Sequence, residues 1–558
     1  MTRGMPGKLI LAVIAAGIAV ACATSDAQLD KALSSITIED LVKHVKVLGS
    51  DEFEGRLPSS AGEEKTVAYL IEQFEALGLQ PGNGDSWVQE VPLVSITADP
   101  NIVLNVTRRD GRRTTTLDFD YGDEIMAWTT RVVDAVDVMN SEMVFVGYGI
   151  VAPEYGRNDY EGLDVEGKTV VILVNDPGFA TKDPALFTGN AMTYYGRWTY
   201  KYEEAARQGA AAAFIVHETE PAAYGWNTVE GSWSGPQFSM VADDDNMSRV
   251  AVEGWLTIET TREIFELAGQ DYDELKVTAT QADFEAVPMD VSASIAVSNT
   301  IEHSTSNNVL ALLPGGERAD EYVIYTSHWD HLGRDASLEG DQIYNGALDN
   351  ATGTAALFSL AKAFQSLDAP PARSIVFIAV TAEEQGLLGS AYYGENPVFP
   401  LDKTAAAINI DGLNIYGPMK DIVVVGYGAS ELDDYLAAAA EKQDRVLVPD
   451  PDAAKGYYYR SDHFSLAKQG VPALYTDTGD DHLEHGVEWT RKRKDEYTAT
   501  HYHMPSDEYR EEWDLRGAVD DIRLWFMVGY TIGGESSFPN WREGSEFKAK
   551  RDEMMGTD

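Results

Sequence analysis

Cysteine is almost absent from this sequence. Its 558 residues include one cysteine, Cys22, close to the N-terminus. A single cysteine cannot form a disulfide within the chain, so no disulfide framework holds the fold together. We expect stability to come mainly from packing, because 44% of the residues are hydrophobic and the length suffices for more than one domain.

Basic residues are scarce as well. The chain has 43 lysines and arginines against 91 aspartates and glutamates, which gives a formal net charge of −48. The acidic residues are spread along the sequence instead of forming a tail. Such a surface repels phosphate backbones, so we expect no nucleic-acid partner.

The apolar run at the N-terminus is short. Leu9 to Val20 follows Arg3 and Lys8, and small residues come after it. The run falls short of the about 20 apolar residues that a transmembrane helix needs. A positive start, a short apolar stretch and small residues are typical of a secretory signal, so we expect residues 1–27 to be removed on export.

Cys22 lies at the end of this segment, in Ala-Val-Ala-Cys. That placement resembles the processing site of a bacterial lipoprotein, and a lipid attached there would account for the lone cysteine. The alternative is ordinary cleavage after Ser25-Asp26-Ala27. We therefore expect an exported protein that is either periplasmic, anchored by lipid at the outer membrane, or secreted.

Hydrophobic periodicity divides the rest of the chain into regions. Residues 30–95 contain two helical patterns and one strand. Residues 96–291 are rich in strand patterns and lack ionisable clusters at ligand spacing, which indicates an inserted, mainly β module. In residues 296–535 strands alternate with helices, and residues 536–558 form a polar C-terminal tail. The predicted fold class is α/β, a largely parallel, mixed central sheet flanked by helices.

Carboxylates and a histidine lie where the expected strands of residues 296–535 end. In an open α/β sheet, ligands bind outside the carboxyl ends of the strands, so we expect these side chains to share one crevice. The residues are His328 after the strand 322–327, Glu383 and Glu384 after 374–380, Asp411 after 405–410, and Asp349 in a Gly-flanked loop that opens a helix.

This combination of side chains suits a hydrolytic metal site. Such a site needs nitrogen and oxygen ligands that leave room for water, plus a carboxylate free to move a proton. Asp330 forms His-x-Asp with His328, and its carboxylate could orient the imidazole through the second ring nitrogen. Glu383 could carry the proton, since neighbouring side chains at a strand end point in different directions.

Five motifs occur in order along the chain. They are Ser-His-Trp-Asp-His-Leu-Gly, Asn-Gly-Ala-Leu-Asp-Asn-Ala-Thr-Gly, Ala-Glu-Glu-Gln-Gly-Leu-Leu-Gly-Ser, Asn-Ile-Asp-Gly and Arg-Ser-Asp-His-Phe. Together they resemble the co-catalytic di-zinc exopeptidases, which include bacterial leucyl-type aminopeptidases and glutamate carboxypeptidases. The resemblance covers roughly residues 30–95 and 296–535. Residues 96–291 resemble the protease-associated (PA) domain that many members carry.

The resemblance implies two zinc ions bridged by Asp349. One ion would be completed by His328 and Asp411, the other by Glu384 and a late histidine. We assign His503 as this histidine, because Tyr-His-Met-Pro-Ser-Asp matches the family's His-x-Pro-x-Asp phrase. The competing histidines are His482, His485 and His501.

Further roles follow from the same resemblance. Glu383 would be the general base that passes a proton from water to the leaving amine. Asp507 would support His503. Tyr458 matches the position of a tyrosine that steadies the tetrahedral intermediate in some members, and a packing role for it is equally open. The remaining histidines near the motifs, His331 and His463, are expected to line the pocket or to have a structural role, and not to bind metal.

The expected function is that of an exported zinc exopeptidase, an aminopeptidase acting on peptide substrates. A glutamate-type carboxypeptidase is the alternative on the same site, and it would need arginines to hold a carboxylate. Arg460 is the only arginine beside a motif. A non-catalytic binding scaffold would lack ligands, and here none is missing. We expect the inserted domain to roof the crevice and limit substrate size.

Overall fold

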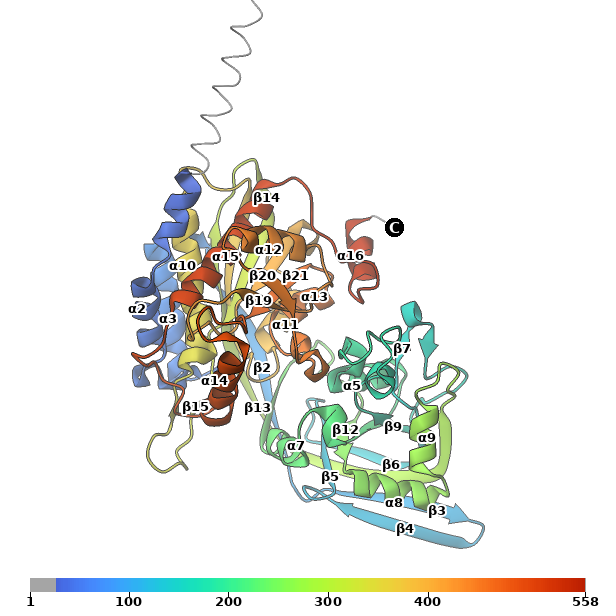
Figure 1. The fold of residues 1–558 in the computed structure, drawn as a ribbon. Helices are drawn as coiled ribbons and strands as arrows, with labels where there is room; N and C mark the ends of the chain where they lie inside the picture. The colour runs from blue at the N-terminus through green and yellow to red at the C-terminus, as the bar shows by residue number, and fades with distance from the viewer. Residues whose placement is uncertain (1–26, 557–558) are drawn as a thin grey trace, which may run out of the picture.

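Two long strands connect the two halves of the molecule. The computed structural model describes residues 27–556, and in it β2 (Val88–Ala98) and β13 (Val287–Leu313) lead from one half into the other (Figure 1). The two strands are antiparallel partners, from Asn299 opposite Ala98 to Val309 opposite Val88. The inserted region is therefore attached through a paired ribbon.

The expected signal segment lies almost wholly outside the described residues. Residues 1–26, with Cys22 among them, fall in this part of the chain. Export and lipid attachment accordingly stay predictions. Within residues 27–556 no helix is both long and apolar enough to cross a bilayer.

A mixed sheet forms the core of the larger half. Its central strands are parallel, while β13 and β19 run antiparallel to their neighbours β17 and β21. Every residue of the central strand β17 is buried, as in a sheet covered on both faces. The predicted α/β class is confirmed. From β13 outward the order is β17 (Arg373–Val380), β14 (Arg318–His328), β18 (Thr404–Asn409), β21 (Ala473–Asp477), β19 (Asp421–Val425) and β20 (Val446–Pro449).

Helices cover the two faces of this sheet. The first turns of α2 and α3 are capped by Thr37 and Ser60, whose side chains accept backbone N–H groups, and these caps fix where the helices begin. One face shares a single hydrophobic core with α2 (Ile38–Leu48), α3 (Ala61–Ala76), α10 (Thr352–Gln365), α12 (Leu432–Glu441) and α15 (Arg516–Gly534). The other face carries α11 (Leu388–Glu395) and α13 (His463–Lys468), and α14 (Gly486–Thr500) follows the sheet in sequence.

The inserted region has its own sheet and its own hydrophobic cores. Its central strands β9, β10 and β12 are parallel, and helices α5 (Trp198–Arg207) and α8 (Ile258–Ala268) contribute to the cores. The N-terminal part of β13 belongs to this sheet. The order is β4 (Arg113–Asp120), β3 (Val103–Asp110), β13, β6 (Ala135–Phe145), β9 (Thr169–Leu173), β10 (Ala212–Val216), β12 (Val252–Leu256) and β5 (Ile125–Trp128).

One segment of the inserted region packs on the larger half. The ring of Tyr194 contacts those of Tyr459 and Phe464, with ring centroids 6.0 and 5.0 Å apart. The backbone N–H of Met192 donates to the carbonyl of Ala453 at 3.1 Å. This contact seats the inserted region on the loop that precedes α13.

The C-terminal segment differs from the predicted polar tail. Trp541 and Phe547 are buried in the core that contains α11 and α13, and the indole N–H of Trp541 donates to the carbonyl of Gly470 at 2.9 Å. The segment ends in α16 (Lys548–Met555), whose Arg551 is buried and donates to the Thr404 carbonyl at 2.9 Å. Two buried aromatic residues and a buried arginine thus attach an otherwise polar stretch to the domain.

Candidate metal centre

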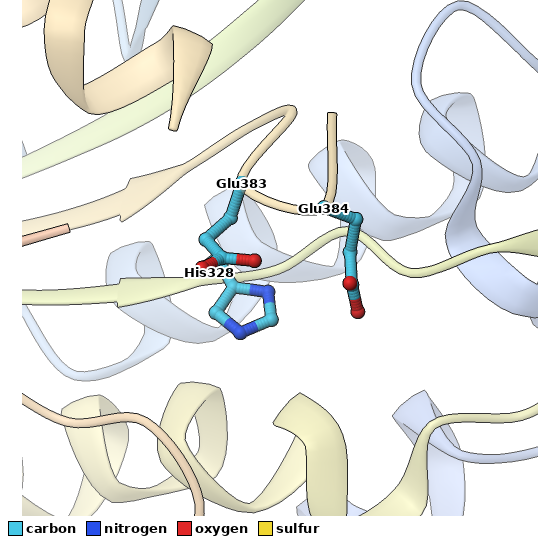
Figure 2. Close-up of side chains that lie close together, drawn as sticks. All are labelled: His328, Glu383 and Glu384. Atoms are coloured by element: carbon cyan, nitrogen blue, oxygen red, sulfur yellow. The ribbon is translucent and has the colours of Figure 1, made fainter. Parts of the chain in front are cut away.

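Parallel strands bring the predicted ligands to one edge of the sheet. His328 ends β14, Glu383 and Glu384 follow β17, and Asp411 follows β18. Because β14 is parallel to both neighbours, these residues meet at a common edge. Figure 2 shows the Glu383 and Glu384 side chains leaving the same turn on the side where the His328 ring lies.

Asp349 lies between two histidines. Its Oδ1 is 3.3 Å from Nε2 of His328, and its Oδ2 is 3.2 Å from Nε2 of His503. The His328 Nε2 is also 3.2 Å from Oδ1 of Asp411, and the His503 Nε2 is 3.1 Å from Oε2 of Glu384. The five predicted ligands therefore form two donor groups that share the carboxylate of Asp349.

The donor atoms are close together and are not all satisfied by hydrogen bonds. The Nε2 of His503 is buried yet has no hydrogen-bond partner of acceptable geometry among the described residues, although two carboxylate oxygens lie close to it. Sets such as His328, Asp349 and Asp411 place one donor atom each within 4.8 Å of the others. This mixture of imidazole nitrogen and carboxylate oxygen is a donor set that zinc accepts.

The electrostatics of the site also favour a cation. Burial, followed by the negative charges of Asp411 and Glu384, raises the pKa of Glu383 well above its usual range. Burial likewise raises the pKa of Asp330 to about 8. Burial opposes ionisation of Asp349 too, but its contacts with His328 and His503 hold its pKa well below the usual range. So many carboxylates ionise together only when extra positive charge is present.

Asp330 holds the turn that carries the two glutamates. Its carboxylate accepts the backbone N–H of Glu383 at 3.1 Å and that of Glu384 at 3.4 Å. Its expected contact with the imidazole of His328 is longer, 3.9 Å from Nδ1, and that nitrogen lies closer to the backbone carbonyl of Asp330, at 3.2 Å. Asp330 therefore positions Glu383 through the main chain.

Asp507 acts on a different partner from the one predicted. Its carboxylate accepts the backbone N–H groups of Leu348 and Asp349, at 3.1 to 3.2 Å, and so fixes the turn that presents Asp349. Asp507 was expected to contact the His503 side chain, but its carboxylate instead binds the main chain of Leu348 and Asp349. The reason is local, because the turn before α10 leaves these N–H groups without a helical partner.

The structure does not bring Tyr458 to the ligands. Its ring packs against those of His463 and Phe547, and its hydroxyl is buried without a hydrogen-bond partner in the described chain. After burial, the charges that raise its pKa are those of Glu546 and Asp433. The C-terminal segment covers this tyrosine, which makes packing the better interpretation.

Tyr502 lies beside one of the predicted ligands, His503. Its ring stacks on that of His503, with centroids 3.9 Å apart, and 44% of the residue is exposed. Desolvation, and after it the charges of Asp349 and Glu384, raises the pKa of its phenol. In the sequence, the only indication of a role for Tyr502 is that it directly precedes His503. That indication depends on His503 being the late histidine ligand.

The histidines that compete for the late position lie elsewhere. His482 and His485 stack on each other at 4.7 Å beside Trp489, and Nδ1 of His501 contacts the Ser506 hydroxyl at 2.8 Å. His331, expected in the pocket wall, is buried with Nδ1 2.6 Å from Oε1 of Glu384. It therefore contacts a ligand directly.

Two supporting residues escaped sequence reasoning. Arg56 is buried and donates four hydrogen bonds, at 2.6 to 2.9 Å, to carbonyls on three separate loops. The Ser461 hydroxyl donates to Oδ2 of Asp411 at 2.6 Å. Ser461 lies within a recognised motif, whereas Arg56 lies in a charged loop that resembles a surface turn. The carbonyls that Arg56 binds belong to Leu48, Trp329, Asn345 and Gly346.

Comparison with known proteins matches this half of the molecule. Residues 308–527 match the family model described as "Peptidase family M28". Aminopeptidase NAALADL1 of Mus musculus is 34% identical over 129 residues, which are 22% of this chain and 16% of that protein. The probable glutamate carboxypeptidase LAMP1 of Arabidopsis thaliana is 32% identical over 161 residues, 28% of this chain and 20% of that protein. The chain thus matches about a fifth or less of the length of these relatives.

Solved structures align along most of the chain at low identity. An aminopeptidase from Aneurinibacillus sp. strain AM-1 is 20% identical, covers 91% of this chain and 97% of its own, and has a TM-score of 0.49. A zinc aminopeptidase from Bacillus subtilis is 18% identical with a TM-score of 0.40, and covers 90% and 98%. The PA resemblance of the inserted region stays a prediction. All the predicted ligands lie within residues 308–527, the segment that matches the model of peptidase family M28.

Proposed function

We propose that this protein is a zinc-dependent exopeptidase that removes N-terminal residues from peptides. The observation that carries the proposal is the position of Asp349, whose two oxygens face two different histidines. Each histidine has a further carboxylate beside it, Asp411 for His328 and Glu384 for His503. Two zinc ions that share Asp349 would use all five side chains.

Zinc, when bound, would polarise the scissile carbonyl and lower the pKa of the attacking water. Glu383 is suited to move the proton, because the two ligand groups do not need its carboxylate and the backbone contact with Asp330 fixes its turn. It would take a proton from the water and later give it to the departing amine. Its raised pKa, caused first by burial, favours holding that proton in between.

Tyr502 would take the role that the sequence suggested for Tyr458. A phenol beside the ligands can donate a hydrogen bond to the carbonyl oxygen as negative charge develops on it. The stacking of Tyr502 on His503 and its 44% exposure support contact with substrate. Tyr458 is partly buried, its hydroxyl is covered and its ring stacks on Phe547 of the C-terminal segment, so contact with substrate would require this segment to move away.

The excess of carboxylates supports an aminopeptidase. Beyond the three carboxylate ligands, the partly buried Glu383 and the buried Asp330 and Asp462 surround the site. Those that ionise when zinc is bound would attract the protonated α-amine of a peptide and repel its terminal carboxylate. The names of the matched relatives do not separate the two activities, because both an aminopeptidase and a probable glutamate carboxypeptidase match.

One observation favours the carboxypeptidase alternative. Arg460 and the inserted region's Arg197 are near enough for the charge of Arg460 to lower the pKa of Arg197, after burial as the main cause. Neither guanidinium forms an ion pair with a described residue. Two adjacent unpaired arginines could hold a carboxylate. Peptides with a blocked N-terminus therefore distinguish the two activities, because only a carboxypeptidase would cleave them.

The inserted region would limit substrate length. It packs on the loop before α13 through Tyr194, close to the motif that contains Ser461. A domain at this place narrows access to the strand ends.

We further propose that the protein is exported by its N-terminal segment, with Cys22 as a lipid anchor. Mass spectrometry of the mature protein would detect that modification.

The first experiment measures metal content and substrate choice together. We expect about two zinc ions per purified chain, and chelator-sensitive cleavage of aminoacyl substrates but not of N-blocked dipeptides. Release of the C-terminal residue from N-blocked dipeptides would establish the carboxypeptidase instead. A chain that binds no metal after gentle purification would refute both and favour a non-catalytic scaffold.

A further inference from the structure

The edge of the inserted sheet is an unusual feature of this molecule. Strand β4 pairs only with β3, in an unbroken register from Val103 opposite Asp120 to Asp110 opposite Arg113. The hairpin lies at the far side of the inserted region from the larger half of the molecule (Figure 1). No other described strand or helix is paired with the outer side of β4.

This edge lacks proline, lysine and a bulge, three of the usual devices that prevent pairing with another chain, and its charged residues are Arg113, Asp118 and Asp120. Natural edge strands are interrupted by proline, lysine or a bulge, or are very short. Strand β4 reads Arg-Thr-Thr-Thr-Leu-Asp-Phe-Asp, spans eight residues and has a register without shifts. Its Thr114 and Thr116 are exposed, and threonine favours extended backbone.

The hairpin geometry shows which backbone groups are free. Gly111 and Arg112 form a two-residue turn with Gly111 at φ 59°, so Asp110 and Arg113 are the first hydrogen-bonded pair. Pairs then alternate, and Thr116 opposite Thr107 is a pair without ladder hydrogen bonds. Their hydroxyls lie 3.0 Å apart, as expected for such a close pair. The N–H and C=O groups of Thr116 therefore point away from β3.

The charges along β4 are complementary to themselves. The turn end carries Arg112 and the other end carries Asp120, and both side chains are exposed and form no ion pair with a described residue. The backbone N–H of Asp120 already donates to Oε2 of Glu124 at 2.8 Å, so at this end the charge, and not the backbone, is available to a partner. If two β4 strands pair antiparallel about Thr116, Arg112 of each chain lies opposite Asp120 of the other. Cross-strand pairs of opposite charge stabilise a sheet, and like charges in those positions destabilise it.

We propose that β4 binds β4 of a second copy of this chain, which joins the two inserted sheets into one continuous sheet. The contact is symmetric, since each strand presents the same groups to the other. Pairing one strand of each chain buries far less surface area than the about 1,600 Å² that a standard stable interface buries. The dimer is therefore expected to be weak and to depend on protein concentration.

The test uses two charge-reversal variants of the full mature protein, Arg112→Asp and Asp120→Arg. Each alone places like charges at both pairs, so its dimerisation should be roughly tenfold weaker than that of the unaltered chain. An equimolar mixture restores Arg–Asp pairing at both ends and should dimerise like the unaltered chain. Sedimentation velocity over about a hundredfold concentration range measures all four samples.

A third variant separates backbone pairing from charge. Thr116→Pro removes an outward N–H and leaves the inner pairing with β3 intact, so it should abolish the dimer. Circular dichroism and unchanged peptidase activity per chain would show that each variant is folded. An unaltered chain that stays monomeric throughout, a dimer that survives Thr116→Pro, or a mixture that fails to associate would each overturn the proposal.

Discussion

Glu383 and Glu384 are neighbours with different proposed roles. Replacing Glu383 by Gln should leave metal binding intact and lower kcat by roughly 10²–10⁴-fold, because only proton transfer is lost. Replacing Glu384 by Gln should lower the zinc content, because this side chain lies 3.1 Å from His503 Nε2. Elemental analysis beside kcat measurements distinguishes the two. Zinc loss in the Glu383 variant would mean that the assignments are exchanged.

Arg56 is the residue whose replacement should cost the most stability near the site. Arg56→Lys cannot satisfy the four carbonyls that the guanidinium binds, so the free energy of unfolding should fall by about 2–4 kcal/mol. Urea unfolding measures the loss. The matched control is Arg516→Lys, at a side chain 60% exposed, and it should change stability by less than about 0.5 kcal/mol. Equal losses of unfolding free energy in both variants would contradict a special stabilising role for the Arg56 hydrogen bonds.

His44 gives the fold a pH dependence that is independent of metal. Burial, and after it Lys43, lowers the pKa of His44 from 6.5 to about 4. The folded state thus prefers the neutral ring, so its contribution to stability is present above pH 6.5 and is lost as pH falls toward 4. His44→Gln should show a smaller fall in unfolding free energy across this window. Identical pH profiles for the two chains would refute the assignment.

At the scale of elements, the C-terminal segment is an integral part of the larger half. Trp541→Ala should lower the free energy of unfolding by about 3–5 kcal/mol, because it empties a buried site and removes the donor to the Gly470 carbonyl. Lys550→Ala, at an exposed position of α16, is the control and should have little effect. Chemical denaturation compares them. A tail that is dispensable for packing would make both substitutions equally harmless.

The site could be predicted from sequence to the extent that local patterns encode it. His328, Glu384 and Asp411 each follow a buried strand, and parallel pairing brings such positions together. The hydrogen bonds of Arg56 could not be predicted, because its partners are main-chain carbonyls. Every residue has such a carbonyl, so the sequence does not mark these four. Tyr458 was chosen from a motif, but burial by the distant C-terminal segment depends on tertiary packing alone.

At the scale of the whole molecule, metal should stabilise the fold. The carboxylates around Asp349 repel one another in the buried site, and a ligand that binds only the folded state shifts unfolding toward higher temperature. Chelation should therefore lower the Tm, and restored zinc should raise it again. Differential scanning calorimetry with and without chelator checks this. A Tm that is insensitive to chelator would argue against resident zinc.

The fold class followed from the sequence because strands and helices alternate over residues 296–535. The bounds of the inserted region were less accessible. The sequence placed a break near residue 291, yet β13 continues from Val287 to Leu313 through both sheets. Periodicity identifies a strand but does not show that its two ends belong to different sheets. That division depends on pairing with β6 at one end and with β17 at the other.

The paired β2–β13 connection restrains how the inserted region can move. An inserted domain on two flexible linkers can rotate freely relative to its host domain. Here the two connecting strands β2 and β13 are paired with each other, and β11 (Pro236–Met240) pairs with the other side of β2. Rotation about such a ribbon requires the whole ladder to bend, which is far stiffer than a change at a few loop residues. For the proposed peptidase activity we therefore expect the inserted region to keep a nearly fixed position relative to the predicted metal ligands, so that the same lengths of peptide are accepted throughout turnover.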